Sequence, residues 1–374
     1  MAKIVIIGWY GTETIGDRAI LAGLLHLFAE TYSSLEVSIG SLYPFLTQRS
    51  LHEDFDFYST ISLGRLNKIS IFDSGNPSDL NREIDVSDLV AIGGGPLYDN
   101  LTEMYMLEYA MARAYKKNKK TAILGCGLGP LKIKKYLKIF LNIYKYSTIR
   151  IFRDDNIKDF TLDSSYLLSC DPAVFAAVFF DENRVSSLEN INTIAINIRE
   201  IISGVNGLSV DYWKKEFSRF IRCLLNNTSK DLMMIPMHTF YVGGDDRNTM
   251  NEIAMELHSE RIHVQNIPLS LAQIMELYAS AHSCIGMRFH SVLLQTLLNG
   301  NNYVLDYTDP EKGKTINLLK QLGLREEFSG RYVSLINNKH IDLKIEDKQV
   351  IVERTMIEKY RSQYINALHS LSVE

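Results

Sequence analysis

The sequence predicts an α/β protein made of two Rossmann-like domains. Short and nearly continuous apolar segments alternate with longer amphipathic segments, glycine-rich turns follow several of the apolar segments, and the whole pattern restarts near Asn192. Apolar strands that alternate with helices are typical of a parallel sheet covered on both faces. A length of 374 residues agrees with two such domains.

The first domain is predicted to span residues 1–185. Its strands are expected, in chain order, at Lys3–Ile7, Glu36–Ile39, Leu89–Ile92, Thr121–Leu124, Ile149–Phe152 and Tyr166–Leu168. Helices are expected between them at Asp17–Tyr32, Glu103–Lys117 and Ile133–Lys145. Residues 43–88 have the least regular pattern, and the stretch "FDSGNPSDLNREIDVSD" in this region is predicted to be a loop.

The second domain is predicted to span residues 186–374, after the polar stretch "DENRVSSLENIN". Strands are expected in "TIAINIR", "DLMMIPM", "IHVQNI", Ser283–Ile285 and Tyr303–Asp306. Helices are expected at Asp211–Asn226, Asn248–Ser259, Ser270–Ala281 and Ser291–Leu298. The last segment, Lys348–Leu371, has the length and periodicity of a terminal helix that packs back on the first domain. Two facing domains of this kind form a cleft beyond the carboxyl ends of their strands.

Composition and charge exclude several functional classes. The chain is 46% hydrophobic and 22% charged, with a net charge of −4, which is typical of a soluble globular protein and gives no basic surface for nucleic acid. The start "MAKIVIIG" has no signal-peptide pattern, and no apolar run approaches the roughly 18 residues of a membrane span. The four cysteines are dispersed without ligand spacing, which predicts reduced thiols in a cytoplasmic protein and no metal site.

A glycine turn follows the first predicted strand. In "GTETIGD", Gly11 and Gly16 have the spacing of a phosphate loop, but Asp17 and Arg18 stand where that loop needs Lys and Ser or Thr. The turn is therefore not a nucleotide phosphate loop. Asp17 either caps the following helix or accepts hydrogen bonds from the hydroxyl groups of a sugar.

Two more glycine turns follow later strands. "IGGGPLYDN" contains Gly94, Gly95 and Asp99, and "GCGLGP" spans Gly125–Pro130. Each turn alone is explained by close packing at a strand end. Because the carboxyl ends of parallel strands meet at one edge of a sheet, the three turns together predict a place where the backbone approaches a ligand.

Three segments could bind an anion or transfer protons. Arg153 ends a strand in "IFRDD", and Arg288 and His290 lie between a strand and a helix in "IGMRFHS". Arginine binds carboxylate or phosphate with two hydrogen bonds, and histidine transfers protons near neutral pH. The structural alternatives are an ion pair of Arg153 with a neighbouring aspartate in "RDD", and a His290 that only caps its helix.

Further polar groups follow strands of the second domain. "IPMHTFYVGGDD" carries His238, Asp245 and Asp246, and Lys312 and Lys314 lie on a loop after another strand. Taken alone, the two lysines are interpreted as solvated side chains. The segment Lys132–Lys145 is basic and amphipathic, which is typical of an ordinary helix with a solvated lysine face or of a helix on an anionic membrane surface.

In order and spacing, these motifs resemble the polysaccharide pyruvyl transferase family over nearly the whole chain. The resemblance rests on "GTETIGDRAIL", "GGGPLYD", "GLGP", "FRDD" and "CDPAVF" in the first half. It continues with "AINIR", "IPMHTFYVGGDD" and "GMRFHS" in the second half. The resemblance implies a GT-B-like pair of domains without a nucleotide-sugar donor.

The resemblance also implies an activity. Members of the family transfer the enolpyruvyl unit of phosphoenolpyruvate to a sugar, usually as a ketal, and release phosphate. By motif position, Arg153, Arg288, Lys314 and His290 would bind phosphoenolpyruvate, with His290 as the proton-transfer residue. Lys314 is chosen over Lys312 by its offset from the following Leu-Gly-Leu. The acceptor-binding residues would be Gly11, Gly16, Asp17, Gly94, Gly95, Asp99 and His238.

The expected partners are phosphoenolpyruvate and a sugar of a cell-surface or exopolysaccharide precursor, carried by a lipid or a nucleotide. No metal or cofactor is expected beyond the donor substrate. A cytoplasmic location is expected, with peripheral binding at the inner face of the membrane if the acceptor is lipid-linked. Two rival functions are a GT-B-type glycosyltransferase that uses a nucleotide sugar and a non-catalytic relative that binds sugar.

Overall fold

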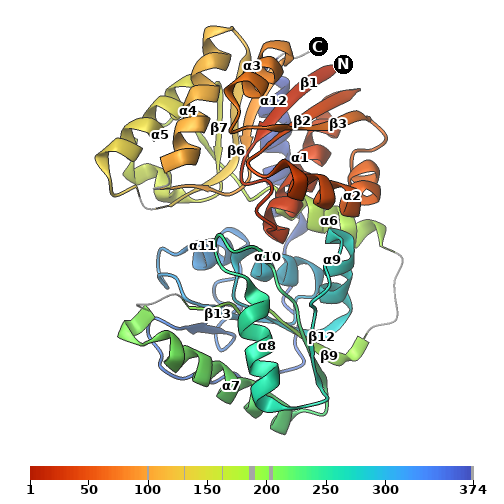
Figure 1. Cartoon of the computed structure of the whole chain (residues 1–374). Coiled ribbons are helices and arrows are strands. Elements are labelled where there is room, and N and C mark those ends of the chain that lie inside the picture. Colours follow the sequence, from red (N-terminus) through yellow and green to blue (C-terminus); the bar gives the residue numbers. More distant parts are fainter. Residues whose placement is uncertain (99–100, 130, 162, 185–189, 202–204, 372–374) are drawn as a thin grey trace. The chain divides into compact units, whose positions relative to one another are not determined.

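The computed structural model describes residues 1–98, 101–129, 131–161, 163–184, 190–201 and 205–371. The chain divides into two compact units. The first consists of Met1–Glu13, Asp17–Ala176 and Arg354–Glu374, and the second of Thr14–Gly16 and Ala177–Glu353. Each unit has its own parallel sheet with helices on both faces (Figure 1). The predicted fold class, two Rossmann-like α/β domains, is confirmed.

The sheet of the first unit has the strand order β3-β2-β1-β4-β6-β7-β8, and β5 pairs with β6. All of these pairs are parallel, so the carboxyl ends of the strands share one edge. All five residues of β4 are buried, as expected for a central strand. The strands are β1 (Ala2–Ile7), β2 (Leu35–Ser41), β3 (Leu66–Asp73), β4 (Leu89–Gly93), β5 (Pro96–Leu97), β6 (Lys120–Leu128), β7 (Ile149–Phe152) and β8 (Leu167–Leu168).

Helices cover both faces of this sheet. On one face α3 (Pro77–Val86), α4 (Leu101–Lys116) and α5 (Lys134–Tyr146) share a core with residues of β1, β4 and β6. The other helices are α1 (Ile15–Thr31), α2 (Pro44–Ile61), α6 (Ala173–Asn183) and α12 (Arg354–His369), with a short 3₁₀ turn at Asp155–Asp159. In α5 the buried residues Ile139, Phe140, Ile143 and Tyr144 recur at helical spacing, which explains why this basic segment forms a surface helix.

The C-terminal helix α12 packs on the first unit, as predicted from the sequence, although the sequence analysis counted this segment in the second domain. The Tyr364 hydroxyl donates a hydrogen bond of 2.8 Å to the Cys170 carbonyl, and its ring packs 5.5 Å from the ring of Phe175. Arg361 forms an ion pair with Glu30 of α1. Figure 1 shows this blue helix among the red and orange elements of the first unit. The units divide at Ala176/Ala177, within α6, whereas the sequence placed the end of the first domain at residue 185.

The prediction of a loop within residues 43–88 is wrong. This region forms α2, β3 and α3. Strand β3 lies at the sheet edge and only Phe72 among its eight residues is buried, so its sequence lacks the continuous apolar pattern of a central strand. Helix α3 follows at once, because the Asn76 side chain accepts a hydrogen bond from Ser78 N and Pro77 occupies the first turn.

The sheet of the second unit is parallel, with the order β11-β10-β9-β12-β13-β14. Its core contains Trp213, Phe217 and Phe220 of α7. The strands are β9 (Asn190–Ile196), β10 (Asp231–Met234), β11 (Ile262–Val264), β12 (Ala281–Gly286), β13 (Asn302–Asp306) and β14 (Tyr332–Ser334). The helices are α7 (Val210–Asn227), α8 (Asp246–Leu257), α9 (Leu271–Ser280), α10 (Phe289–Leu298) and α11 (Lys314–Gln321), with a 3₁₀ turn at Val205–Gly207. The sequence did not predict α11 or β14.

Candidate active site

Arg288 occupies the turn between β12 and α10, at the carboxyl edge of the second sheet. Its backbone N–H donates to Asn197 Oδ1 at 3.0 Å, and its side chain binds the Asp246 carboxylate with two nitrogens. Nε lies 2.8 Å from Oδ2 and an Nη atom lies 2.6 Å from Oδ1. This two-point contact with a carboxylate that is 1% exposed orients the guanidinium plane.

The Asp246 carboxylate has further partners. Met237 N donates to Oδ2 at 3.1 Å, and Asn197 Nδ2 donates to the same oxygen at 3.3 Å. Residues that follow β9, β10 and β12 therefore all donate hydrogen bonds to one buried carboxylate. The sequence marked Asp246 only as half of an acid pair, because its contact with Arg288, 42 positions away, is visible only in the folded chain.

Arg199 lies beside Arg288. Its side chain donates to Tyr307 Oη at 3.2 Å and to the Gly243 carbonyl at 3.3 Å. Arg288 donates to the same Gly243 carbonyl at 3.4 Å. Two guanidinium groups that share one carbonyl oxygen lie close together, and their mutual repulsion favours an anion nearby.

Tyr307 follows β13, and cations surround its phenol group. The Arg199 guanidinium carbon lies 5.1 Å from the ring centroid, and Lys314 Nζ lies 5.8 Å from it. Burial raises the pKa of Tyr307, but Lys314, Arg199 and Arg288 outweigh this effect and lower it to about 8. We call Arg199, Arg288, Tyr307 and Lys314 the cationic cluster. The sequence predicted two of its four members.

His290 lies in the first turn of α10, two residues after Arg288. Its ring packs edge-on against Phe289 at 4.9 Å. A Cβ atom on Gly16 would lie 1.9 Å from His290 Nδ1, so the position of this ring requires glycine there. Thr14–Gly16 is the short segment that clusters with the second unit.

Both ring nitrogens of His238 have partners. Nδ1 lies 2.8 Å from Thr14 Oγ1, and Nε2 lies 2.6 Å from the Val242 carbonyl. Burial, followed by the charge of Arg288, lowers the pKa of His238, so the neutral ring dominates at pH 7. His238 thus anchors the Thr14–Gly16 segment, and its predicted role in acceptor binding stays a prediction.

Arg153 lies at the carboxyl edge of the first sheet, after β7. It forms a buried ion pair with Asp171, whose side chain is 1% exposed. The sequence had considered only the neighbouring aspartates as partners. The next residue, Asp154, instead accepts a hydrogen bond from Leu128 N at 3.1 Å, and burial raises its pKa to about 6. A donor-binding role for Arg153 stays a prediction.

The glycines of the first unit have structural duties. Gly11, Gly94 and Gly95 have φ angles of +90°, +109° and +71°, which disfavour any other residue. A Cβ atom on Gly95 would lie 2.1 Å from Cδ1 of Trp9, whose ring stacks on Tyr98 at 5.3 Å. These glycines therefore leave room for neighbouring side chains at the sheet edge. Their expected approach to a ligand stays a prediction.

Two carboxyl groups of the first unit interact. Asp17 is buried in the first turn of α1, and both of its predicted roles, as a helix cap and as a sugar ligand, stay predictions. Burial, followed by the charge of Asp17, raises the pKa of Glu103 to about 8. Glu103 lies in the first turn of α4, where acidic residues are common, so nothing in the sequence marked it as a site residue. The predicted acceptor residue Asp99 lies outside the described residues.

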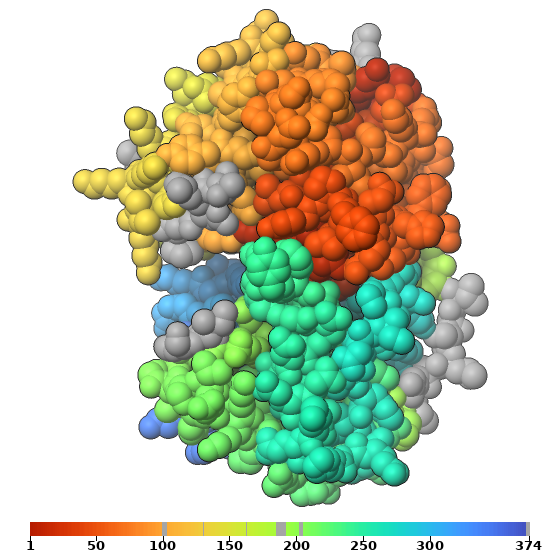
Figure 2. Space-filling view, in the orientation of Figure 1, coloured from red at the N-terminus to blue at the C-terminus, as the bar shows by residue number. Residues whose placement is uncertain are grey.

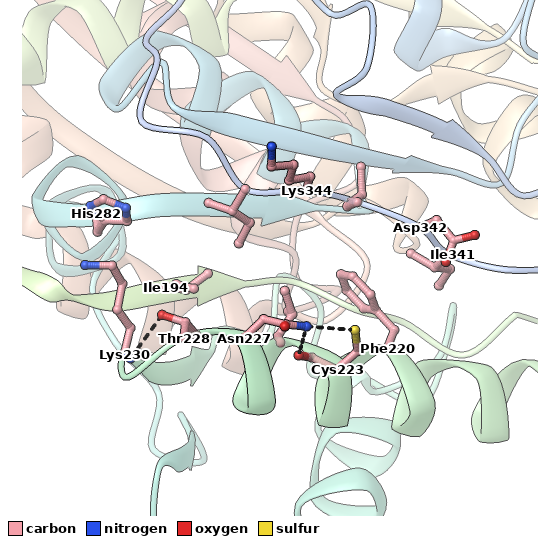
Figure 3. Close-up of a pocket in the computed structure, with 13 residues that line it drawn as sticks. Ile194, Phe220, Cys223, Asn227, Thr228, Lys230, His282, Ile341, Asp342 and Lys344 are labelled. Carbon is pink, nitrogen blue, oxygen red and sulfur yellow. Dashed lines mark hydrogen bonds between the residues drawn. The ribbon is translucent and has the colours of Figure 1, made fainter.

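A separate cavity of about 690 Å³ lies in the second unit (Figure 3). Lys230 precedes β10 and His282 is the second residue of β12, so this cavity opens at the amino ends of the strands. The cationic cluster follows the carboxyl ends. The cavity is lined by Ile194, Phe220, Cys223, Leu224, Asn227, Thr228, Lys230, His282 and Ile341–Ile345.

Two features are absent from the described residues. No helix there combines the length and apolar character needed to cross a membrane. No group of three or more His, Cys, Asp or Glu side chains in the described part of the chain is arranged to hold a metal ion.

The chain resembles solved structures in its fold. UDP-GlcNAc 2-epimerase from Methanocaldococcus jannaschii is 10% identical, with a TM-score of 0.55 over 100% of this chain and 94% of that one. MnaA from S. aureus, solved with UDP, is 13% identical, with a TM-score of 0.55 over 100% and 91%. At these identities the likeness shows only the fold, which is GT-B-like.

Sequence comparison identifies the family. No curated protein sequence is significantly similar to the chain. The family model described as polysaccharide pyruvyl transferase matches residues 15–310, which is most of the chain. The match includes the turn that contains Gly16 and Asp17, Arg153 and the Arg288–His290 turn. The chain therefore belongs to the polysaccharide pyruvyl transferase family.

Proposed function

We propose that the protein transfers the enolpyruvyl unit of phosphoenolpyruvate to a sugar, as a ketal, and releases phosphate. The observation that carries this proposal is the convergence of Arg199, Arg288 and Lys314 around Tyr307 at one sheet edge. Phosphoenolpyruvate is small and carries two anionic groups. Several preorganised cations at one site match such a ligand better than a neutral sugar.

Each group has a proposed role toward the donor. Arg288, held by Asp246, presents its remaining N–H groups to the phosphate or carboxylate, and Lys314 adds a mobile charge at the start of α11. Arg153 is the proposed donor ligand of the first unit. Its ion pair with Asp171 would orient it, as Asp246 orients Arg288.

His290 is the proposed proton-transfer residue. Protonation of C3 of the enol converts the methylene to a methyl group and leaves a cation at C2. A sugar hydroxyl attacks C2 and returns a proton to the imidazole, and the second hydroxyl then displaces phosphate, which leaves with the proton of that hydroxyl as hydrogen phosphate. One imidazole can donate the first proton and accept a later one, because an unperturbed histidine side chain changes its charge near neutral pH.

The acceptor is proposed to bind to the first unit. Its carboxyl groups Asp17 and Glu103 can accept hydrogen bonds from sugar hydroxyls, and a Cβ atom on Gly94 would lie 3.8 Å from Asp17 Oδ1, so this turn approaches Asp17. We propose a sugar of a cell-surface or exopolysaccharide precursor as the acceptor, carried by a lipid or a nucleotide.

The second candidate function is a glycosyltransferase that uses a nucleotide sugar. One observation favours it: several similar folds were solved with UDP or a UDP-sugar. Within this alternative the cationic cluster would bind the diphosphate. Both functions need anion binding, so the identity of the bound donor distinguishes them.

Calorimetric titration tests the proposal. Phosphoenolpyruvate and UDP-N-acetylglucosamine are titrated separately into the wild type, Arg288→Ala and the control Arg222→Ala. Arg222 is an exposed arginine of α7 that pairs with Glu256. Binding of phosphoenolpyruvate alone, weakened in Arg288→Ala and unchanged in Arg222→Ala, supports pyruvyl transfer. Binding of the UDP-sugar alone would replace this proposal with the glycosyltransferase.

We also propose that the protein works in the cytoplasm at the inner face of the membrane. Lys134, Lys138 and Lys145 recur along the exposed side of α5, with the partly exposed Leu141 between them. Figure 2 shows long side chains of this part of the chain, in yellow, projecting from the surface. A basic helix face with apolar members suits the headgroups of anionic lipids.

Cosedimentation with phosphatidylglycerol vesicles tests this membrane proposal. Each lysine near the surface contributes about 1 kcal/mol, so reversing all three charges should weaken binding by about a hundredfold or more. Charge reversal at the exposed Lys68, Lys339 and Lys348 is the matched control. Equal binding by the two triple variants would contradict docking through α5.

A further inference from the structure

Arg199 and Tyr307 form a pair that connects two strands of the second sheet. Arg199 follows β9 and donates to Tyr307 Oη at 3.2 Å, while Tyr307 follows β13. We infer that both residues bind the anionic donor, and that Tyr307 does so as a neutral phenol that donates its proton in a hydrogen bond. This inference rests on the proposed function and adds two ligands to its donor site.

Charge balance singles out Arg199. The buried Asp246 pairs with Arg288, and the buried Asp306 interacts with Lys314. No ion pair among the described residues includes Arg199, whose side chain donates to the carbonyl oxygens of Glu200 and Gly243 and to the Tyr307 hydroxyl. A partly buried cation without a carboxylate is costly, and an incoming anion would remove this cost.

Hydrogen-bond geometry gives Tyr307 its role. Because Arg199 donates to the phenol oxygen, the phenol proton is directed elsewhere. The other charges that act on this phenol are the cations Lys314 and Arg288. A bound anion among the same groups accepts the phenol proton in a hydrogen bond, whereas a phenolate would repel that anion.

Donor binding is therefore linked to the protonation of Tyr307. The pKa of Tyr307 is about 8 in the free protein, and a bound anion raises it because a second negative charge nearby disfavours the phenolate. Affinity should be full below pH 7 and fall as the pH rises through 8. For a group with this pKa, the loss of donor affinity between pH 7 and pH 9 is about tenfold.

Titration calorimetry with phosphoenolpyruvate at pH 7 and pH 9 tests the inference. The second pKa of a phosphate monoester is about 6, so the donor is already about nine-tenths ionised at pH 7 and changes little up to pH 9. At pH 7, Arg199→Ala and Tyr307→Phe should each weaken binding by about tenfold or more, because each loses a hydrogen bond to a charged group. Tyr307→Phe should also lose the pH dependence, with less than about a twofold change left.

Two control variants lie on α7, away from the cluster. Arg222→Ala removes an exposed arginine that pairs with Glu256, and Tyr212→Phe removes a hydroxyl that donates to the Lys339 carbonyl. Both should bind with wild-type affinity and keep the tenfold pH effect. Melting curves for all four variants show whether each is folded.

The outcomes separate the inference from the proposed function. Wild-type affinity in folded Arg199→Ala and Tyr307→Phe would overturn the inference and leave pyruvyl transfer in place. An unchanged pH effect in Tyr307→Phe would overturn the role of the neutral phenol. Failure of the wild type to bind phosphoenolpyruvate would overturn the proposed function and this inference with it.

Discussion

Removal of the Asp246 carboxylate should destabilise the second unit strongly. In Asp246→Ala, the Arg288 guanidinium, whose side chain is only 15% exposed, would lose the carboxylate that now accepts hydrogen bonds from two of its nitrogens. Met237 N and Asn197 Nδ2 would lose an acceptor as well. Breaking a buried ion pair by removing one partner costs about 3–5 kcal/mol, because the other charge stays buried without compensation.

This cost converts into a measurable change in melting temperature. One kcal/mol shifts the midpoint by roughly 2–4 °C in a domain of 150–250 residues, so the transition of the second unit should fall by roughly 6–20 °C. Differential scanning calorimetry of the full chain measures this fall. Affinity for phosphoenolpyruvate, measured below the new transition, should also drop because Arg288 loses its orientation.

The adjacent Asp245 provides a matched control. Its side chain caps α8 by accepting from Arg247 N, and it pairs with the partly exposed Arg247 side chain. Asp245→Ala should cost about 1 kcal/mol, which is typical of a lost cap, and should leave donor affinity unchanged. If Asp246→Ala lowered the melting temperature no more than Asp245→Ala, the argument from the buried ion pair would be refuted.

Three further predictions concern the first unit. In urea unfolding, Gly95→Ala should destabilise it by about 1–3 kcal/mol more than the control Gly64→Ala. Both positions have positive φ, but only Gly95 would place a Cβ atom against Trp9. Equal losses of unfolding free energy in the two variants would contradict the contact. The raised pKa of Glu103 makes the folded wild type less stable as the pH rises, so its melting temperature should fall between pH 5 and pH 8. Glu103→Gln should remove this fall. An unchanged pH profile in the variant would argue against a buried acid. Tyr364→Ala should cost about 3–5 kcal/mol and Tyr364→Phe about 1 kcal/mol, since the ring fills the core and the hydroxyl makes one hydrogen bond; equal losses would contradict this division.

Much of the fold could be predicted from the sequence because central strands carry their own signal. The residues of β4 and most residues of β1 are buried, so their sequences are continuous apolar runs. Strand β3 has only one buried residue and β14 has only three residues, so neither carries that signal and neither was predicted. Helix α11 has only eight residues, too few for its periodicity to stand out.

The candidate site could be predicted only in part. Arg288 and His290 were found because they lie between a predicted strand and a predicted helix, and the resemblance to a known family added Lys314. Arg199 and Tyr307 were not chosen, because nothing in the sequence relates residues that are 108 positions apart.

The sequence by itself determined the alternation of strands and helices, the two-domain organisation and the family. Local periodicity and turn chemistry act over a few residues, so they can be read without the folded chain. Only the tertiary structure decided that Asp246 orients Arg288, that Asp171 pairs with Arg153 and that cations surround Tyr307. These features depend on burial and on charges that meet in space, and both arise only when distant strands end at a common edge.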